Sequence, residues 1–168
     1  MSTVFLPKVT LIDLGPGAQI VIYGFRAVAF GQTKCGCLAK VFERSFGRYQ
    51  GGEALRVLKD LTNSIGHKGL RKFKVAPTRC KHLTQDEASL LSALSAAQDE
   101  DPDRAQAHLS WLLARPPTEY EETLVFDMVE YFSIQGLEIN TPENGAQFST
   151  IGSGKTTMAP VTSQVGNA

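Results

Sequence analysis

The sequence contains little cysteine, with Cys35, Cys37 and Cys80 the three thiols in 168 residues. An odd and sparse set is unlike the framework of a secreted disulfide-rich protein, so we expect a reducing, cytoplasmic location. The chain also lacks any run of about 18 or more apolar residues, and no contact with a membrane is predicted. The N-terminus lacks the basic start and the long apolar stretch of a signal peptide.

Common catalytic motifs are absent as well. We find no nucleophile elbow, no HExxH zinc-protease motif and no GxGxxG dinucleotide motif in a suitable context. Gly152–Thr157 ends like a phosphate-binding loop, but Ser149 occupies the position of its first glycine. We therefore favour a protein that is not an enzyme. Catalysis in an apolar pocket between helices stays open, because such pockets leave little trace in a sequence.

The net charge of zero hides a sharp division along the chain. Up to Gln85 there are 14 lysines and arginines and 4 acidic residues, a net charge of +10. From Asp86 onward there are 3 lysines and arginines and 13 acidic residues, a net charge of −10. This asymmetry indicates a polyanionic partner for the basic half, unless the two halves lie against each other or only display solvated faces of opposite sign.

The cations are densest from His67 to His82, which we call the basic segment. It contains no carboxylate, and its cations are the predicted partner-binding residues: Lys68, Arg71, Lys72, Lys74, Arg79 and Lys81. From Gly69 to His82 the segment has no helical period and contains Pro77, so we expect an ordered loop with a short strand there. We expect the apolar side chains of Leu70, Phe73 and Val75 to hold this loop against the core.

Two kinds of acidic partner fit the basic segment. Its cations could neutralise phosphates, and Phe73 lies among them as an aromatic ring does in proteins that bind single strands. Core packing is the better interpretation of Phe73, however, and no helix-turn-helix presents these cations to a duplex. An acidic protein surface would serve the cations equally well, so both a protein and a nucleic acid stay open.

Apolar periodicity predicts mainly α structure. Residues 1–14 are expected to form an extended arm that ends at a Gly-Pro-Gly break. Three helices should follow, over roughly residues 18–31, residues 34–46 with Thr33 as the cap, and residues 51–65 with Gly66 as the stop.

Local capping signals predict the helices of the second half. In Thr84–Glu87 and in Thr118–Glu121 the threonine hydroxyl should accept a free N–H while the glutamate reaches back to the cap. Asp101-Pro102 should open a further helix between them. The short links imply antiparallel neighbours. From residue 139 to residue 168 the apolar period stops, and we expect a disordered polar tail.

Three thiols and an imidazole define an alternative site. Cys35, Cys37, Cys80 and His82 form a legitimate structural zinc set. The spacing is weak evidence, because one residue separates each pair where zinc sites usually have two, and helical residues two apart face different directions. The other readings are inert thiols, or a redox pair in which Cys35, beside Lys34 and near a helix N-terminus, faces Cys80.

Together these patterns predict a mainly α fold with a single compact domain. Five to six helices in antiparallel pairs should span residues 15–138, with the extended arm before them, the ordered basic loop within them and the tail after them. The predicted function is a non-enzymatic cytoplasmic adaptor or regulatory protein that binds an acidic protein or a nucleic acid. The alternative is a small metal-binding or thiol-redox protein.

Overall fold

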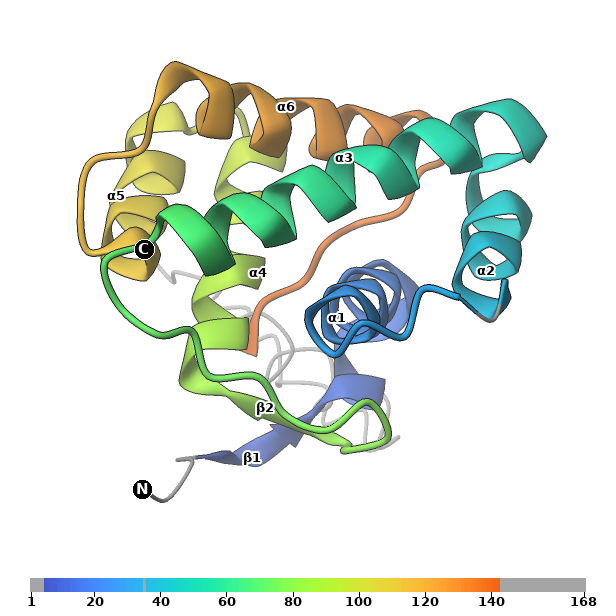
Figure 1. Cartoon of the computed structure of the whole chain (residues 1–168), viewed down its shortest axis with the longest axis horizontal. Helices are drawn as coiled ribbons and strands as arrows, with labels where there is room; N and C mark the ends of the chain where they lie inside the picture. Colours follow the sequence, from blue (N-terminus) through green and yellow to red (C-terminus); the bar gives the residue numbers. More distant parts are fainter. Residues whose placement is uncertain (1–4, 35, 143–168) are drawn as a thin grey trace, which may run out of the picture.

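The computed structural model describes residues 5–34 and 36–142, which form six α-helices, a short 3-10 helix and a two-stranded sheet (Figure 1). In chain order the elements are β1 (Phe5–Thr10), η1 (Leu11–Leu14), α1 (Gly15–Ala29), α2 (Cys37–Phe46), α3 (Arg48–Lys68), β2 (His82–Thr84), α4 (Gln85–Gln98), α5 (Pro102–Leu113) and α6 (Glu119–Ile134). The prediction of a mainly α fold is therefore confirmed.

The two strands join the N-terminal arm to the end of the basic segment. β1 and β2 pair antiparallel, with Phe5 opposite Thr84, Thr10 opposite His82 and an irregularity between these positions. The N–H of Leu11 extends the contact by donating to the carbonyl of Lys81 at 2.8 Å. The arm is thus anchored to the rest of the chain through the basic segment.

The helices of the second half begin where local capping signals predict. Thr84 and Thr118 each accept the N–H of the glutamate three residues later, and each glutamate accepts the N–H of its cap residue. Asp101 caps α5, and Pro102 occupies its first position. These starts need only side-chain and backbone groups within one turn, so sequence alone is enough to find them.

Several helix boundaries in the first half differ from the prediction, and α1 and α3 each begin three residues earlier than expected. Two further differences have a clear physical reason. The second helix begins at Cys37, and Thr33 is not its cap. Gly36, directly before Cys37, has a φ of 66°, which a right-handed helix does not allow. α3 runs through Gly66 to Lys68 instead of stopping. A glycine costs a helix only about 1 kcal/mol relative to alanine, and the buried Ile65 beside it keeps this turn packed.

The helices surround one continuous apolar core. α3 and α6 lie side by side across the top of Figure 1 and run in opposite directions, and α4 and α5 form an antiparallel hairpin next to them. α1 packs against α3 on the other side. The Phe46 and Phe132 rings, 4.9 Å apart between centroids, join α2 to α6. The antiparallel pairing expected from the short links is visible in α4 and α5.

Packing continues past residue 138, where we expected the helical domain to end. Ile139 is buried, and its N–H donates to the Gln98 side chain at 2.8 Å. The Asn140 amide donates to the carbonyl of Leu14 at 3.0 Å. The chain after α6 therefore joins the end of α4 to the start of α1. Residues 139–142 of the predicted tail are thus part of the described fold, and the rest of the tail, with the Gly152–Thr157 motif, lies outside the described residues.

Candidate partner-binding site

The basic segment leaves α3 at Lys68 and reaches β2 without forming a helix. Exposure alternates along its first part, as expected for an extended backbone. The exposed positions are Leu70, Lys72 and Lys74, and the half-buried positions are Arg71, Phe73 and Val75. The predicted loop ends at β2, which begins at its last residue, His82, so no strand lies within the loop itself.

The apolar side chains of the basic segment divide into inward and outward ones. Phe73 packs its ring against Phe25 of α1, with the centroids 4.8 Å apart. Val75 also packs against the core. Leu70 is 74% exposed, so the expectation that it holds the loop against the core is wrong. Its backbone provides the attachment instead, because the N–H of Leu70 donates to the carbonyl of Leu113 at 2.8 Å.

The far end of the basic segment wraps around one buried guanidinium, that of Arg26 in α1. Arg26 is 0% exposed and donates to both carboxylate oxygens of Glu87, at 2.7 and 2.8 Å. Its remaining N–H groups donate to the carbonyls of Pro77, Cys80 and His82 at 3.3, 2.5 and 2.8 Å. A guanidinium has five N–H donors, and all five are used here. Arg26 therefore ties the turn at residues 77–82 to α1 and α4.

The first turn of α4 binds the extended part of the basic segment. Asp86 accepts the N–H of Lys74 at 2.7 Å, and Glu87 accepts the N–H of Ala76 at 3.1 Å. The Thr84 hydroxyl donates to the carbonyl of Lys74 at 2.7 Å. One edge of the extended backbone is thus occupied by side chains at the start of α4.

Arg71 is placed differently from the other predicted partner-binding residues. One of its terminal nitrogens lies 2.8 Å from Asp86, and its Nε donates to the carbonyl of Trp111 at 3.1 Å. The guanidinium also lies 4.1 Å from the centroid of the Trp111 ring, in a cation–π contact. Arg71 is therefore engaged within the molecule, and its charge is balanced there.

The other five cations face solvent. These exposed residues are Lys68, Lys72, Lys74, Arg79 and Lys81. The ion pairs formed among the described residues include none of them. The acidic residues that follow the segment in sequence, Asp86 and Glu87, are buried and already bonded to Arg71 and Arg26. Five exposed cations therefore lie close together in the sequence, and the carboxylates that follow them are turned inward.

A second arginine–glutamate pair holds the near end of the basic segment. Glu121 accepts two hydrogen bonds from Arg115, at 2.6 and 2.9 Å, and one from the Ser64 hydroxyl at 2.7 Å. Arg115 also donates to the carbonyl of Lys68 at 3.0 Å. Burial opposes ionisation of Glu121, but the hydrogen bonds from Arg115, Thr118 and Ser64 outweigh it and lower the pKa of Glu121 to about 2. The carboxylate is therefore charged at neutral pH and joins α3 to α6.

The predicted zinc set is only partly described, because Cys35 lies outside the described residues. Cys37 is exposed at the first position of α2, and Cys80 is half-buried in the turn around Arg26. In the ranges 5–34 and 36–142, no group of three or more His, Cys, Asp and Glu side chains is arranged to hold a metal ion. Zinc binding and a redox pair of Cys35 with Cys80 stay predictions.

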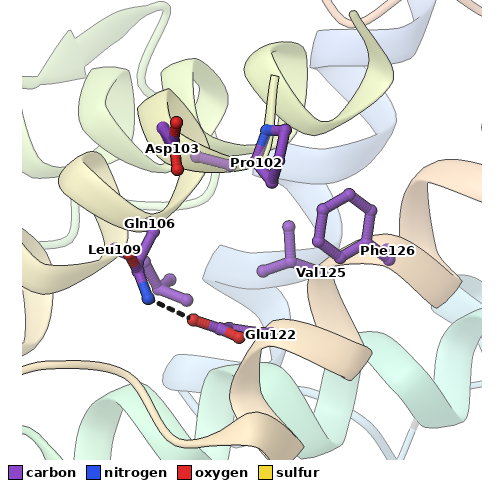
Figure 2. Close-up of a pocket in the computed structure, with 8 residues that line it drawn as sticks. Pro102, Asp103, Gln106, Leu109, Glu122, Val125 and Phe126 are labelled. Atoms are coloured by element: carbon purple, nitrogen blue, oxygen red, sulfur yellow. Dashed lines mark hydrogen bonds between the residues drawn. The ribbon is translucent and has the colours of Figure 1, made fainter. Parts of the chain in front are cut away.

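The acidic half contains a hollow between α5 and α6 with a volume of about 130 Å³. Figure 2 shows Gln106 and Glu122 pointing toward each other, and the Gln106 amide donates to Glu122 at 2.7 Å. Pro102, Val125 and Phe126 supply apolar lining. Ligand pockets usually enclose about 300–1,000 Å³, so this hollow is small for a substrate. Its carboxylates, moreover, have no nucleophilic side chain beside them in the lining.

Sequence reasoning identified the cation density and missed the buried pairs that organise it. Arg26 stands alone in the apolar run from Ala18 to Phe30. A charge within such a run needs a buried acceptor. The glutamates of the two capping boxes were candidates, because a capping glutamate has oxygens left to accept further donors. This signal could have linked Arg26 to Glu87.

Comparison of the chain with protein-family models, with curated proteins and with solved structures finds no match. Among the helices that the structure describes, none has both the length and the apolar content of a membrane-spanning segment. A functional proposal therefore depends on the geometry and the charges of the site itself.

Proposed function

We propose that the protein is a non-enzymatic cytoplasmic adaptor or regulator that binds an acidic segment of a partner protein through the outward cations of the basic segment. One observation supports this proposal above the others. Five exposed cations lie within a short stretch, while the carboxylates next to that stretch, Asp86 and Glu87, are buried against Arg71 and Arg26. An external anion is therefore the available counter-charge for this surface.

Three aromatic rings near the cations, those of Phe73, Trp111 and Tyr120, favour a protein over a nucleic acid. Binding to single strands uses exposed ring faces on which bases stack. The Phe73 ring is packed on Phe25. Arg71 lies over one face of the Trp111 ring, and Lys68 lies over one face of the Tyr120 ring. An acidic peptide needs no stacking surface. We therefore propose an acidic protein as the partner, and a nucleic acid is the contrasting outcome in the experiment.

Charge reversal tests the proposal. A fluorescein-labelled poly-glutamate peptide is titrated with the wild type and with the variant Lys72→Glu/Lys74→Glu, and binding is followed by fluorescence anisotropy at low salt. Both side chains are exposed and lack carboxylate partners among the described residues, so the fold should be retained. We expect the variant to bind roughly tenfold more weakly or worse, since each exposed charge contributes up to about 1 kcal/mol.

Two controls separate the alternatives. Cys80→Ser should leave binding unchanged, whereas a thiol- or metal-dependent protein would lose its activity with this substitution and retain it after charge reversal. A labelled single-stranded oligonucleotide is titrated in parallel. Equal binding of the peptide by wild type and charge-reversed protein would contradict the proposal, and tight binding of the oligonucleotide with none of the peptide would replace the protein partner by a nucleic acid.

A further inference from the structure

The extended stretch from Lys72 to Ala76 has one occupied edge and one open edge. The N–H groups of Lys74 and Ala76 are bonded to the side chains at the start of α4. In an extended chain, backbone groups of successive residues point to opposite edges, so those of Phe73 and Val75 lie on the other side. Across the described residues, the N–H and C=O groups of Phe73 and Val75 take part in no hydrogen bond.

A hollow of about 480 Å³ lies along this stretch, between the ends of α1 and α3. Its lining includes the apolar side chains of Phe25, Val28 and Ile65 together with Phe73 and Val75. The hollow therefore offers apolar contacts beside unpaired backbone groups.

The charges and the shape at this hollow limit what can occupy it. Lys72 and His67 are among the residues that line it, and no acidic residue is. Gly66 leaves additional room, because a Cβ built there would meet no atom within 4 Å. An occupant with apolar side chains on one face and negative charge on the other matches this environment.

We propose that an extended segment of the acidic partner adds to the Lys72–Ala76 edge as a β-strand. Backbone hydrogen bonds to Phe73 and Val75 would supply affinity, and alternate apolar side chains would enter the hollow while acidic ones face Lys72 and Lys74. The same edge of a second protein molecule is a poor occupant. Lys72 and Lys74 of the two molecules would then lie opposite one another across the strand pair and repel. The inference rests on the proposed function and specifies the mode of binding.

A blocked hollow tests the strand-addition mode. The probe is a labelled peptide of alternating valine and glutamate, and the variants are Gly66→Leu and its matched control Gly52→Leu. Both glycines lie in α3, and a Cβ at either one meets no atom within 4 Å. Leucine has a higher helix propensity than glycine, so both variants should melt no lower than the wild type. Gly52 is outside the hollow.

We expect Gly66→Leu to weaken peptide binding roughly tenfold or more and Gly52→Leu to leave it within about twofold. In amide hydrogen exchange, the peptide should protect the N–H groups of Phe73 and Val75. Unchanged affinity in Gly66→Leu, or no added protection, would overturn the strand-addition mode. If Lys72→Glu/Lys74→Glu still abolishes binding in that case, the proposed function stands and only the mode fails. Absence of binding to the wild type would overturn both.

Discussion

The Arg26–Glu87 pair shows how one buried contact can shape a surface. Glu87 caps α4, neutralises Arg26 and accepts the N–H of Ala76, all with its two oxygens. Arg26 in turn occupies the carbonyls of the turn at residues 77–82. The carbonyl groups of Pro77, Cys80 and His82 face the buried guanidinium of Arg26, and the side chains of Arg79 and Lys81 in the same turn are exposed. The backbone that carries Arg79 and Lys81 is therefore held by a residue that does not itself reach the surface.

Arg26→Lys should destabilise the protein by roughly 3 kcal/mol, because an ammonium has three donors and cannot satisfy the five acceptor contacts of the planar fork. Urea unfolding followed by circular dichroism measures this change. Arg56→Lys is the matched control, since Arg56 pairs with Glu53 and Asp60 on the exposed face of α3. That control should leave stability nearly unchanged, because exposed ion pairs contribute little. Equal stability of the two variants would contradict the role of Arg26.

Glu121 should make the free energy of unfolding depend on pH in the acidic range. A carboxylate with a lowered pKa stabilises the folded state above its unfolded pKa of about 4.3. That contribution is lost as the pH falls toward its folded pKa of about 2. The shift corresponds to about 3 kcal/mol at neutral pH. Glu121→Gln should therefore be less stable than the wild type at about pH 7, and the gap should narrow by about pH 3. A gap in urea unfolding that does not change with pH would contradict this.

At the scale of the elements, local signals and long-range contacts differ in how well they can be predicted. The starts of α4 and α6 follow from a threonine and a glutamate three residues apart, so the sequence was sufficient. The cation density of the basic segment was equally plain. The sequence did not show which cations turn inward. Arg71 is held by Trp111 and Asp86, and Arg26 is held by Glu87. These partners are distant in sequence. A lone charge in an apolar run indicates that a buried acceptor exists, but it does not by itself specify which one.

The close approach of the chain after α6 to α1 gives a prediction for Gly17. A Cβ at Gly17 would lie 2.1 Å from the carbonyl oxygen of Glu138, so the two segments would have to separate. We expect Gly17→Ala to destabilise the protein by about 1–3 kcal/mol. Gly52→Ala, where a Cβ meets no atom within 4 Å, should be neutral or up to about 1 kcal/mol stabilising. Thermal unfolding checks both, and a neutral Gly17→Ala would contradict the packing of this segment.

At the scale of the whole molecule, few ion pairs of the described residues join the basic half of the chain to the acidic half. Of the ion pairs formed by the described residues, Arg26–Glu87 and Arg71–Asp86 join the basic half to the acidic half. The remaining pairs stay within one half, as Arg115–Glu121 does. The halves therefore do not neutralise each other through ion pairs, apart from contacts at the first turn of α4.

We propose that the position of the cations, and not only their number, determines binding of the acidic partner. Two variants that remove the same charge test it in the poly-glutamate titration. One replaces Lys72, Lys74, Arg79 and Lys81 by glutamine, and the other replaces the exposed Lys34, Lys40, Arg44 and Arg48. We predict a loss of at least roughly tenfold in affinity for the first variant and a change within about threefold for the second. Equal losses in both variants would contradict the account, because net charge alone would then explain binding.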